Sequence, residues 1–517
     1  MALVDYHKKR FMIIEDHAEF RSSLKAMVRM FGAHMVDTAN NGEEGIAKII
    51  NNQYDIVLSD YELGKGKDGQ QILEETRRSG LLKSSSIFVL VTAASTVEMV
   101  MGALEYEPDG YITKPITHEN LKTRLDKIVQ EKNLFAAVDK AIDQKKYGEA
   151  INACNKIAKE HPKYQIKALR IKSKLLLNLE YYDDAKKLFQ KLVDARNFPW
   201  ARLGLGKVAY YEGNYDQALQ VFQQLADEDN RNVEAYDWLS KVYLSQNLPE
   251  EAQKALQHAV ERSPKSIIRQ MDLGKISKTN EDWQIAEVAF RKSVNLGKNS
   301  CYKTADNYTS LVQVLQDKIA NGGGRKTKDA STEALRTLDN LEKEYADNAE
   351  AVLFSKVLRA ETSSSLGKEK ESAHMLTSIA DDLAALDNKM PEQMAHSLAN
   401  VYDANGKKAE ADKLRAKYKA SVNEVLNNDG VRLFKNGQIK EALSVFSEAA
   451  KAPDASNSVL INALQASIKL MENDGTDDSL MEHCGRYINQ LDNLESSDKN
   501  YTRYKKLASA YENFANK

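Results

Sequence analysis

The sequence is short of several features that would place it in a specialised class of protein. It has 3 cysteines in 517 residues, Cys154, Cys301 and Cys484, too far apart to predict a disulfide framework or a zinc site. No hydrophobic run is long enough to predict a transmembrane helix, and the opening Met-Ala-Leu-Val-Asp lacks the apolar core of a signal peptide. We therefore expect a cytoplasmic protein that does not bind membranes.

An excess of charge of one sign is also lacking. The formal net charge is -2, and acidic and basic residues nearly balance both in the first 130 residues and in the rest. We find no basic face and no helix-turn-helix pattern, so nucleic acid is an unlikely partner on these grounds. The part after residue 130 also has no glycine-rich phosphate loop, no nucleophile-base pair and no histidines at metal-ligand spacing. These absences argue against the alternative of an enzymatic or RNA-binding output.

Polar side chains follow successive apolar runs in the first 130 residues. The runs are 11–14, 56–58, 88–91 and 111–112, and the side chains that follow them are Glu15, Asp16, Asp60, Thr92 and Lys114. Helix-length segments with apolar residues at helical spacing, 18–31 and 42–50, lie between the runs. Short apolar runs that alternate with helices predict a parallel sheet, which binds its ligands at the carboxyl ends of its strands. We therefore expect these side chains to converge on one site.

The predicted site suits phosphoryl transfer. Three carboxylates at close quarters repel one another unless a hard dication lies among them, and Mg²⁺ prefers oxygen ligands and can also bind a phosphoryl oxygen. Transfer to a carboxylate needs mainly positioning and neutralised charge, which Mg²⁺ and Lys114 would supply and a Thr92 hydrogen bond would support. One of the carboxylates is therefore predicted to accept a phosphoryl group.

The order and spacing of these residues resemble the receiver domain of two-component response regulators, over residues 1–130. The resemblance implies an α/β doubly wound, flavodoxin/CheY-like fold with a five-stranded parallel sheet. It makes Asp60 the phosphoacceptor and gives the metal Glu15, Asp16, Asp60 and the main-chain carbonyl of Glu62 as ligands. It also implies a phosphate-facing Lys114 and a cis bond before Pro115. The acidic pair is Glu-Asp here, where the family pattern has Asp-Asp, and this pair should still bind Mg²⁺.

The same resemblance implies a conformational switch. Thr92 would supply a hydroxyl that moves toward the phosphoryl group, and Tyr111 would then turn inward. This movement would alter a face that includes Met99, Val100, Leu104, Tyr106 and residues 121–129. The alternative is that Tyr111 is simply a half-buried strand residue.

The chain after about residue 134 is predicted to be all α. Ala150, Ala185, Ala218, Ala252 and Ala286 recur about every 34 residues. The residues twelve positions before them are small in most units, and the residues four positions after them are aromatic or apolar, as in Gly206 with Phe222 and Gly274 with Phe290. This pattern resembles the tetratricopeptide (TPR) repeat, which implies an all-α, TPR-like superhelix of stacked hairpins with a curved groove.

We predict four parts from this pattern. Residues 1–130 form the receiver, 131–300 a TPR array of about five repeats, 301–330 a flexible insertion around the glycine run 322–324, and 331–517 a second, degenerate TPR-like array. No proline or glycine lies between Leu121 and Ile142, so a continuous helix is expected to join the receiver to the first repeat.

Basic residues are predicted to line the groove of the first array. Counting from the aligned alanines puts lysine at one groove-facing position in four successive repeats and Asp139 at that position in the first. The expected groove residues are Lys174, Lys207, Lys241, Lys275, Arg170, Trp200 and Tyr210. Ammonium groups beside aromatic surface suit an acidic protein ligand. The alternative is a solvated helix face, on which lysine is common.

These features predict a phosphorylation-controlled signalling adaptor. A sensor histidine kinase or phosphotransfer protein would phosphorylate Asp60, and the TPR arrays would bind a protein partner in a state-dependent way. The chain would be no enzyme beyond its own phosphotransfer and dephosphorylation, and it looks like response regulators of the VieB type, which carry TPR arrays as output. The alternative is a phosphate sink or kinase inhibitor whose arrays serve only for docking.

Overall fold

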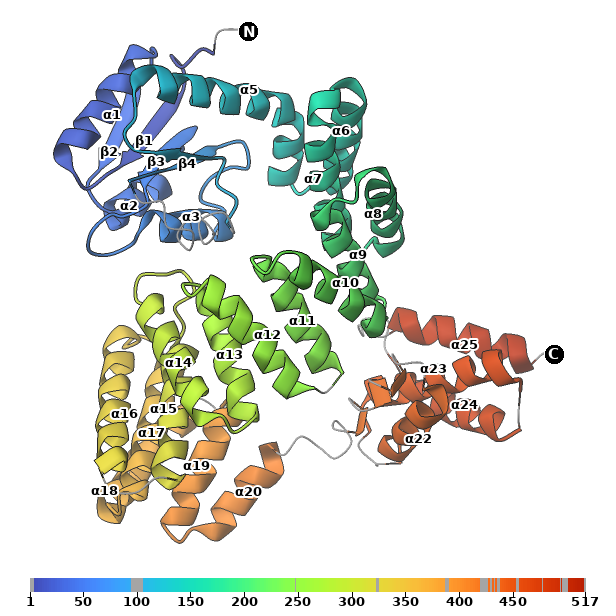
Figure 1. Ribbon diagram of the computed structural model, residues 1–517. Helices are drawn as coiled ribbons and strands as arrows, with labels where there is room; N and C mark the ends of the chain where they lie inside the picture. The colour runs from blue at the N-terminus through green and yellow to red at the C-terminus, as the bar shows by residue number, and fades with distance from the viewer. Residues whose placement is uncertain are drawn as a thin grey trace. The chain divides into compact units, whose positions relative to one another are not determined.

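The computed structural model describes residues 4–93, 106–246, 248–321, 325–385 and 390–418, and most of the C-terminal part. The described C-terminal residues are 426–427, 430–431, 433–434, 438–451, 455–476, 478–492, 494 and 501–515. By internal contacts the chain divides into two units, residues 1–208 with 218–346, and residues 209–217 with 347–517. Figure 1 shows an α/β domain at the N-terminus and helices in the rest of the chain.

The α/β domain is built on a parallel sheet of five strands in the order β2-β1-β3-β4-β5. The strands are β1 (Arg10–Ile14), β2 (Met35–Ala39), β3 (Ile56–Asp60), β4 (Ile87–Thr92) and β5 (Gly110–Thr113). Asp60 pairs with Val91, and Thr92 with Thr113, so the ends of the three strands β3, β4 and β5 lie side by side. The α/β fold and four of the strands were predicted from the apolar runs, and the structure confirms them.

Helices cover both faces of this sheet. Alternate residues of β1 explain why, since Phe11 and Ile13 face α1 (Ala18–Met30) and α5 (His118–Asp143), while Met12 and Ile14 face α2 (Gly42–Asn51) and α3 (Gly69–Arg78). All four of these side chains are fully buried. Strands buried on both faces read as continuous apolar runs, which is why the sequence revealed them. The strand β2, at the edge of the sheet, is only partly buried and gave no such run.

Helix α5 links the sheet to the helical array without a break, as predicted. It runs for 26 residues from its N-cap Thr117, whose hydroxyl accepts a hydrogen bond from Asn120 N. Leu121, Leu125 and Val129 pack on the sheet, whereas Phe135 and Val138 belong to the core of the first helical hairpin. One rigid helix therefore belongs to two cores.

The helices that follow α5 pack in sequence as hairpins within the first unit. They are α6 (Tyr147–Glu160), α7 (Gln165–Asn178), α8 (Tyr182–Arg196), α9 (Pro199–Tyr211), α10 (Tyr215–Glu228), α11 (Val233–Ser245), α12 (Pro249–Arg262), α13 (Ile267–Thr279) and α14 (Trp283–Gly297). Among the residues described here, no helix has the length and the apolar run needed to cross a membrane. The predicted all-α character of this part is confirmed.

The crossings inside the hairpins depend on glycine. A Cβ on Gly206 would lie 2.6 Å from Cε1 of Phe222, and a Cβ on Gly274 would lie 2.6 Å from Cε1 of Phe290. Both rings are fully buried. The pairing of a small residue with an aromatic ring, predicted from the repeat, is therefore a direct contact between the two helices of a hairpin.

The segment predicted as a flexible insertion, residues 301–330, is largely helical instead. Helix α15 spans Ala305–Asn321 and α16 spans Arg325–Glu344, and between them residues 322–324 of the glycine run lie outside the described residues. Tyr308, Leu311, Val312 and Leu315 are buried. The prediction of an insertion rested on the glycine run and did not take account of this apolar periodicity, which is that of a helical hairpin.

The second unit continues with helical hairpins. Its helices are α17 (Ala349–Ser365), α18 (Glu369–Ala385), α19 (Glu392–Ala404), α20 (Lys408–Tyr418), α22 (Ile439–Ala449), α23 (Asn457–Asp474), α24 (Asp478–Leu491) and α25 (Tyr501–Ala515). A Cβ on Gly430 would lie 2.5 Å from Cε1 of Phe446, which repeats the glycine-ring contact of the first unit. The last of these helices, α25, begins at Tyr501.

The close crossing at Gly274 predicts a local sensitivity to a single methyl group. We expect Gly274→Ala to lower the free energy of unfolding by about 1–3 kcal/mol, because the buried Phe290 ring must move. Gly148→Ala is the matched control, since nothing lies within 4 Å of its Cβ position in α6. Urea unfolding followed by circular dichroism measures both, and equal midpoints for the two variants would contradict the proposed contact.

A buried carboxylate on α5 predicts a pH-dependent stability. Asp139 is 8% exposed, its Oδ2 lacks a hydrogen-bond partner, and burial raises its pKa to about 6. Because the pKa is raised in the folded state, stability falls as the pH rises through about 4 to 6. Asp139→Asn should therefore stabilise the protein by about 1–3 kcal/mol above pH 6 and by little near pH 4.

Thermal or urea unfolding at several pH values measures this difference. Glu149→Gln is the control. It removes the same charge from the neighbouring helix α6, but from a side chain that is 65% exposed. A stability gain in Asp139→Asn that does not vary with pH would show that burial of the charge is not its cause.

Candidate functional site

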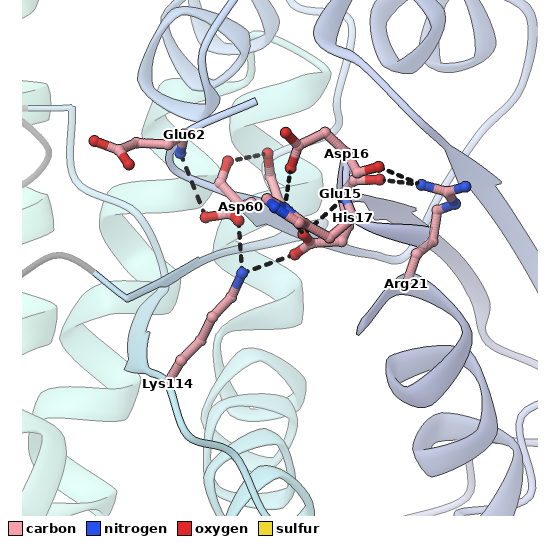
Figure 2. A network of polar contacts seen from close by, with 8 residues as sticks. Glu15, Asp16, His17, Arg21, Asp60, Glu62 and Lys114 are labelled. Carbon is pink, nitrogen blue, oxygen red and sulfur yellow. Dashed lines mark hydrogen bonds and ion pairs between the residues drawn. The ribbon is translucent and has the colours of Figure 1, made fainter. Parts of the chain in front are cut away.

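The ends of β1, β3 and β5 bring two carboxylates and an ammonium group into direct contact (Figure 2). Lys114 Nζ lies 2.6 Å from Asp60 Oδ2 and 2.9 Å from Glu15 Oε2. Glu15 is 0% and Asp60 6% exposed, so the pair is shielded from water. The other oxygen of Asp60, Oδ1, accepts a hydrogen bond of 3.3 Å from Glu62 N. The sequence-predicted residues Glu15, Asp60 and Lys114 therefore form one cluster.

Three residues that the sequence analysis did not name complete this cluster. His17 Nδ1 lies 2.9 Å from Asp16 Oδ1, and Arg21 Nη1 donates to the main-chain oxygens of Glu15, at 2.6 Å, and Asp16, at 3.1 Å. Phe20 lies under the ammonium group of Lys114, whose Nζ is 4.2 Å from the ring centroid. All three belong to the start of α1 or its cap. Their position shortly after the acidic pair in the sequence is the signal that could have identified them.

Burial and pairing oppose each other in the charges of the site. Burial raises the pKa of Glu15, and the nearby Asp60 charge adds to this, although Lys114 acts in the opposite direction. Burial would lower the pKa of Lys114, but its hydrogen bonds with Asp60 and Glu15 outweigh burial and raise it. Lys114 is therefore cationic, and it balances two carboxylates that would otherwise repel each other.

Thr92 and Tyr111, the predicted switch residues, lie on the adjacent strands β4 and β5. Thr92 is 1% exposed at the end of β4, and its side chain hydrogen-bonds with that of Tyr111. Tyr111 packs beside the core on the face of the sheet that α2 and α3 cover. The peptide bond between Lys114 and Pro115 is cis, as the resemblance implied. Met99, Val100 and Leu104 lie outside the described residues.

The acidic end of the site has the donor set of a hard cation. Single ligand atoms of Glu15, Asp16 and His17 lie within 4.8 Å of one another. The two carboxylates fit Mg²⁺, which prefers oxygen, whereas His17 is exposed and paired with Asp16. Asp60 is held by Lys114 and does not join this group. Glu15 and Asp16 are therefore the residues that could hold a divalent ion beside Asp60.

The helical array contacts the α/β domain beside this site. The α14–α15 connector, residues 298–304, lies against α3 and the loop that precedes it. Lys67 Nζ donates to Asn299 O at 2.6 Å, and Asn299 Nδ2 donates to Gly66 O at 2.9 Å. Arg78 Nη1 donates to Cys301 O at 2.7 Å, and its guanidinium lies 4.3 Å from the Tyr302 ring centroid. This contact was not predicted from the sequence.

A buried polar chain runs from the residue after Asp60 to the connector. The Tyr61 hydroxyl donates to Gln70 Oε1 at 2.9 Å, and Gln70 Nε2 donates to Glu74 Oε1 at 3.1 Å. Ser300 Oγ lies 3.4 Å from Glu74 Oε2, and the Tyr106 side chain also hydrogen-bonds with Glu74. Glu74 is 5% exposed, and burial raises its pKa. Hydrogen bonds therefore connect the residue after Asp60 with the α14–α15 connector.

The first array encloses a groove of about 1100 Å³. Residues predicted for it that line it are Arg170, Lys174, Trp200, Lys207, Lys241 and Lys275. Tyr210 is not part of the described lining, and its ring packs against those of Tyr211 and Tyr215, at 5.6 Å and 5.5 Å. Asp139 does not line the groove: it is 8% exposed, and its Oδ2 lies 3.9 Å from Lys132 Nζ of the same helix.

Acids of the chain itself pair with part of the predicted lysine row. Lys207 Nζ lies 2.6 Å from Glu234 Oε1, and Lys174 Nζ lies 2.6 Å from Glu107 Oε1. The ammonium group of Lys241 lies 4.3 Å from the centroid of the Trp238 ring. The groove therefore alternates paired charges with aromatic surface and is not a row of free ammonium groups.

Comparisons with known families agree with this division of the chain. Residues 11–126 match the response regulator receiver domain, and residues 172–232 and 209–271 match tetratricopeptide repeats. The chain therefore carries a receiver domain of two-component signalling followed by TPR repeats.

Proteins with a similar sequence or structure match about a quarter of this chain. The transcriptional regulatory protein DltR of Streptococcus agalactiae is 30% identical over 128 residues, which are 25% of this chain and 55%, about half, of that protein. The chemotaxis protein CheY-3 of Vibrio cholerae is 27% identical over 121 residues, 23% of this chain and 92% of that protein. A CheY-like receiver domain protein structure from Methanospirillum hungatei is 26% identical and covers 24% of this chain and 96% of its own, with a TM-score of 0.23.

The acidic pair predicts a measurable metal affinity. We expect Glu15→Gln and Asp16→Asn each to weaken Mg²⁺ binding about tenfold or more, because each removes a charged oxygen ligand. Glu19→Gln, an exposed glutamate of the first turn of α1, should bind as the wild type does. Isothermal titration calorimetry with magnesium chloride measures the three variants, and an unchanged affinity in Asp16→Asn would refute this assignment.

Proposed function

We propose that this chain is a phosphorylation-controlled signalling adaptor. In this proposal a sensor histidine kinase or phosphotransfer protein phosphorylates Asp60, and the TPR arrays bind a protein partner in a way that depends on the phosphorylation state. The observation that carries the proposal is the contact of Asp60 with Lys114, at 2.6 Å, at the carboxyl ends of the receiver strands. Helix α3 of the same domain contacts the array through Arg78.

The chemistry of the site supports phosphoryl transfer to Asp60. An oxygen of the Asp60 carboxylate would attack the phosphorus of a phosphohistidine, the P–N bond would break with the imidazole as leaving group, and an acyl phosphate would form. Lys114 is placed to follow the new negative charge, since its ammonium group already bridges Asp60 and Glu15. Mg²⁺, with Glu15, Asp16 and the Glu62 carbonyl as proposed ligands, would neutralise charge on the phosphoryl oxygens. Thr92 would donate a hydrogen bond to the phosphoryl group.

Two connections support transmission of the state to the array. The Thr92 hydroxyl would leave Tyr111 for the phosphoryl group, and this exchange shifts the strand end from which α5 begins. The hydrogen bonds from Tyr61 through Gln70 and Glu74 reach Ser300 of the connector. The first connection leads to α5, which packs in the array, and the second to the connector between α14 and α15, so a small change at Asp60 would have a route to the groove.

The partner proposed for the groove is an acidic protein segment with apolar anchors. Arg170, Lys241 and Lys275 line the groove together with Trp200 and Leu203, and this lining suits carboxylates that alternate with hydrophobic side chains. Glu234 and Asp237 also line the groove, but each is paired with a cation of the array, Lys207 and Arg269 respectively, so they do not exclude an acidic ligand. In this proposal the chain acts in the cytoplasm, and its only chemistry is gain and loss of its own phosphoryl group.

Phosphorylation at Asp60 is open to direct measurement. Incubation of the full chain with acetyl phosphate and Mg²⁺ should add one phosphoryl group to its mass, and Asp60→Asn should abolish the addition because the nucleophile is lost. Glu62→Gln is the control that should still be labelled, because its side chain is exposed and only its main chain belongs to the site. Equal labelling of Asp60→Asn and the wild type would overturn the proposed function.

A further inference from the structure

An acid of the receiver, Glu107, lies in the groove of the array and contacts two of its cations. Lys174 Nζ lies 2.6 Å and 2.7 Å from the two carboxylate oxygens of Glu107, and Arg170 Nη2 lies 3.5 Å from Oε1. Arg170 and Lys174 belong to one face of α7, whereas Glu107 precedes β5 of the receiver. All three line the groove. A carboxylate is thus already bound where the groove offers two cations.

The receiver holds Glu107 in place for this contact. Its φ of 48° lies in the left-handed region, which a glutamate rarely adopts. Asp109, two residues after Glu107, forms ion pairs with Arg77 at 2.8 Å and Lys132 at 3.0 Å. It also accepts a hydrogen bond from the Phe88 main-chain nitrogen at 2.9 Å. A strained residue between fixed neighbours indicates that this loop is built to present the Glu107 side chain.

The charge of Glu107 is maintained by its partners. Partial burial acts to raise the pKa of Glu107, but the hydrogen bond to Lys174 and the charges of Lys174 and Arg170 outweigh it and lower the pKa. Arg170 also lies 5.8 Å from the centroid of the Trp200 ring, which limits its freedom. The two cations and the ring therefore make a subsite that recognises a carboxylate beside an apolar surface.

The other paired cations of the groove have a different origin. Lys207 pairs with Glu234 at 2.6 Å, and Arg269 pairs with Asp237 at 2.7 Å and 2.9 Å. These partners come from neighbouring repeats of the array, so they are part of its framework. The acid on Arg170 and Lys174 comes from the regulated domain, which allows its withdrawal without disruption of a repeat.

We propose that Arg170 and Lys174 form a carboxylate subsite for an acidic protein segment, and that Glu107 of the receiver occupies this subsite in cis until the segment displaces it. This inference rests on the proposed function and names its regulation. Glu107 follows Tyr106, which hydrogen-bonds with Glu74 in the polar chain that begins beside Asp60. Phosphorylation of Asp60 would therefore change how strongly Glu107 binds to Arg170 and Lys174.

The energy of this contact suits a switch. The side chains of Glu107 and Lys174 are 57% and 50% exposed, and exposed ion pairs of this kind contribute little. Occupation in cis should therefore lower the apparent affinity for a partner by about two- to fivefold. A contact of this strength competes with a ligand and does not exclude it.

The test measures binding of a fluorescein-labelled oligoglutamate peptide to the full chain by fluorescence anisotropy. Glu107→Gln should bind the peptide about two- to fivefold more tightly than the wild type, because the internal competitor loses its charge. Lys174→Glu should weaken binding about tenfold or more, because it replaces an attractive charge with a repulsive one. Lys172→Glu is the matched control on α7, since Lys172 hydrogen-bonds with Asn155 and lies outside the groove lining.

The outcomes separate this inference from the proposed function. If Glu107→Gln binds as the wild type does while Lys174→Glu and Lys241→Glu bind weakly, the groove binds acids but Glu107 does not compete, and the inference fails alone. If Lys174→Glu and Lys241→Glu also bind as the wild type does, the acidic partner of the proposed function fails with it. Tighter binding of a single-stranded oligonucleotide than of oligoglutamate would overturn the proposed ligand class.

Discussion

The structure depends on the balance of charge at the carboxyl edge of the receiver sheet. Two buried carboxylates, Glu15 and Asp60, lie on either side of one ammonium group, that of Lys114. Loss of one partner from a buried pair costs on the order of 3–5 kcal/mol, so the cluster cannot lose or gain a charge without a response from its surroundings. A phosphoryl group on Asp60 is such a gain. The same interaction that stabilises the resting site therefore makes it sensitive to modification.

The surroundings that would respond are tied to the array at two places. Helix α5 belongs to the core of the receiver and to the core of the first hairpin, and α3 holds the α14–α15 connector through Arg78 and the buried Glu74. Most residues that line the groove lie between these two attachments in the chain, and Glu107 of the receiver lines it as well. A receiver attached at both ends of a groove can alter it by small movements, which is the physical basis of the adaptor function proposed above.

The sequence predicted the parts of the molecule that follow from periodicity. Strands buried on both faces appeared as apolar runs, and the close crossings at Gly206 and Gly274 appeared as small residues at a fixed distance from an aromatic ring. Because strand ends meet at one edge of a parallel sheet, the approach of Asp60 to Lys114 could also be predicted. Strand β2 was missed because an edge strand needs no continuous apolar run.

Contacts between segments far apart in the chain carried no such signal. The connector that binds α3 has no periodic pattern, and its hydrogen bonds use main-chain oxygens such as Asn299 O and Cys301 O, which any sequence supplies. Lys207 and Glu234 are 27 residues apart in the chain and Lys174 and Glu107 are 67 apart, so local spacing could not predict either pair. The glycine run at 322–324 led to the prediction of an insertion, but α15 and α16 on either side of it form a hairpin. The packing of one helix on the other is likewise not visible in local spacing.

The most direct test of coupling between Asp60 and the array is amide hydrogen exchange of the full chain with and without beryllofluoride and Mg²⁺. Our account predicts that the acyl phosphate mimic changes exchange in the loop after Asp60 and in residues 298–304 together, and that Asp60→Asn shows neither change. A response confined to the loop, with identical exchange in the connector, would contradict transmission from the phosphoacceptor to the repeats.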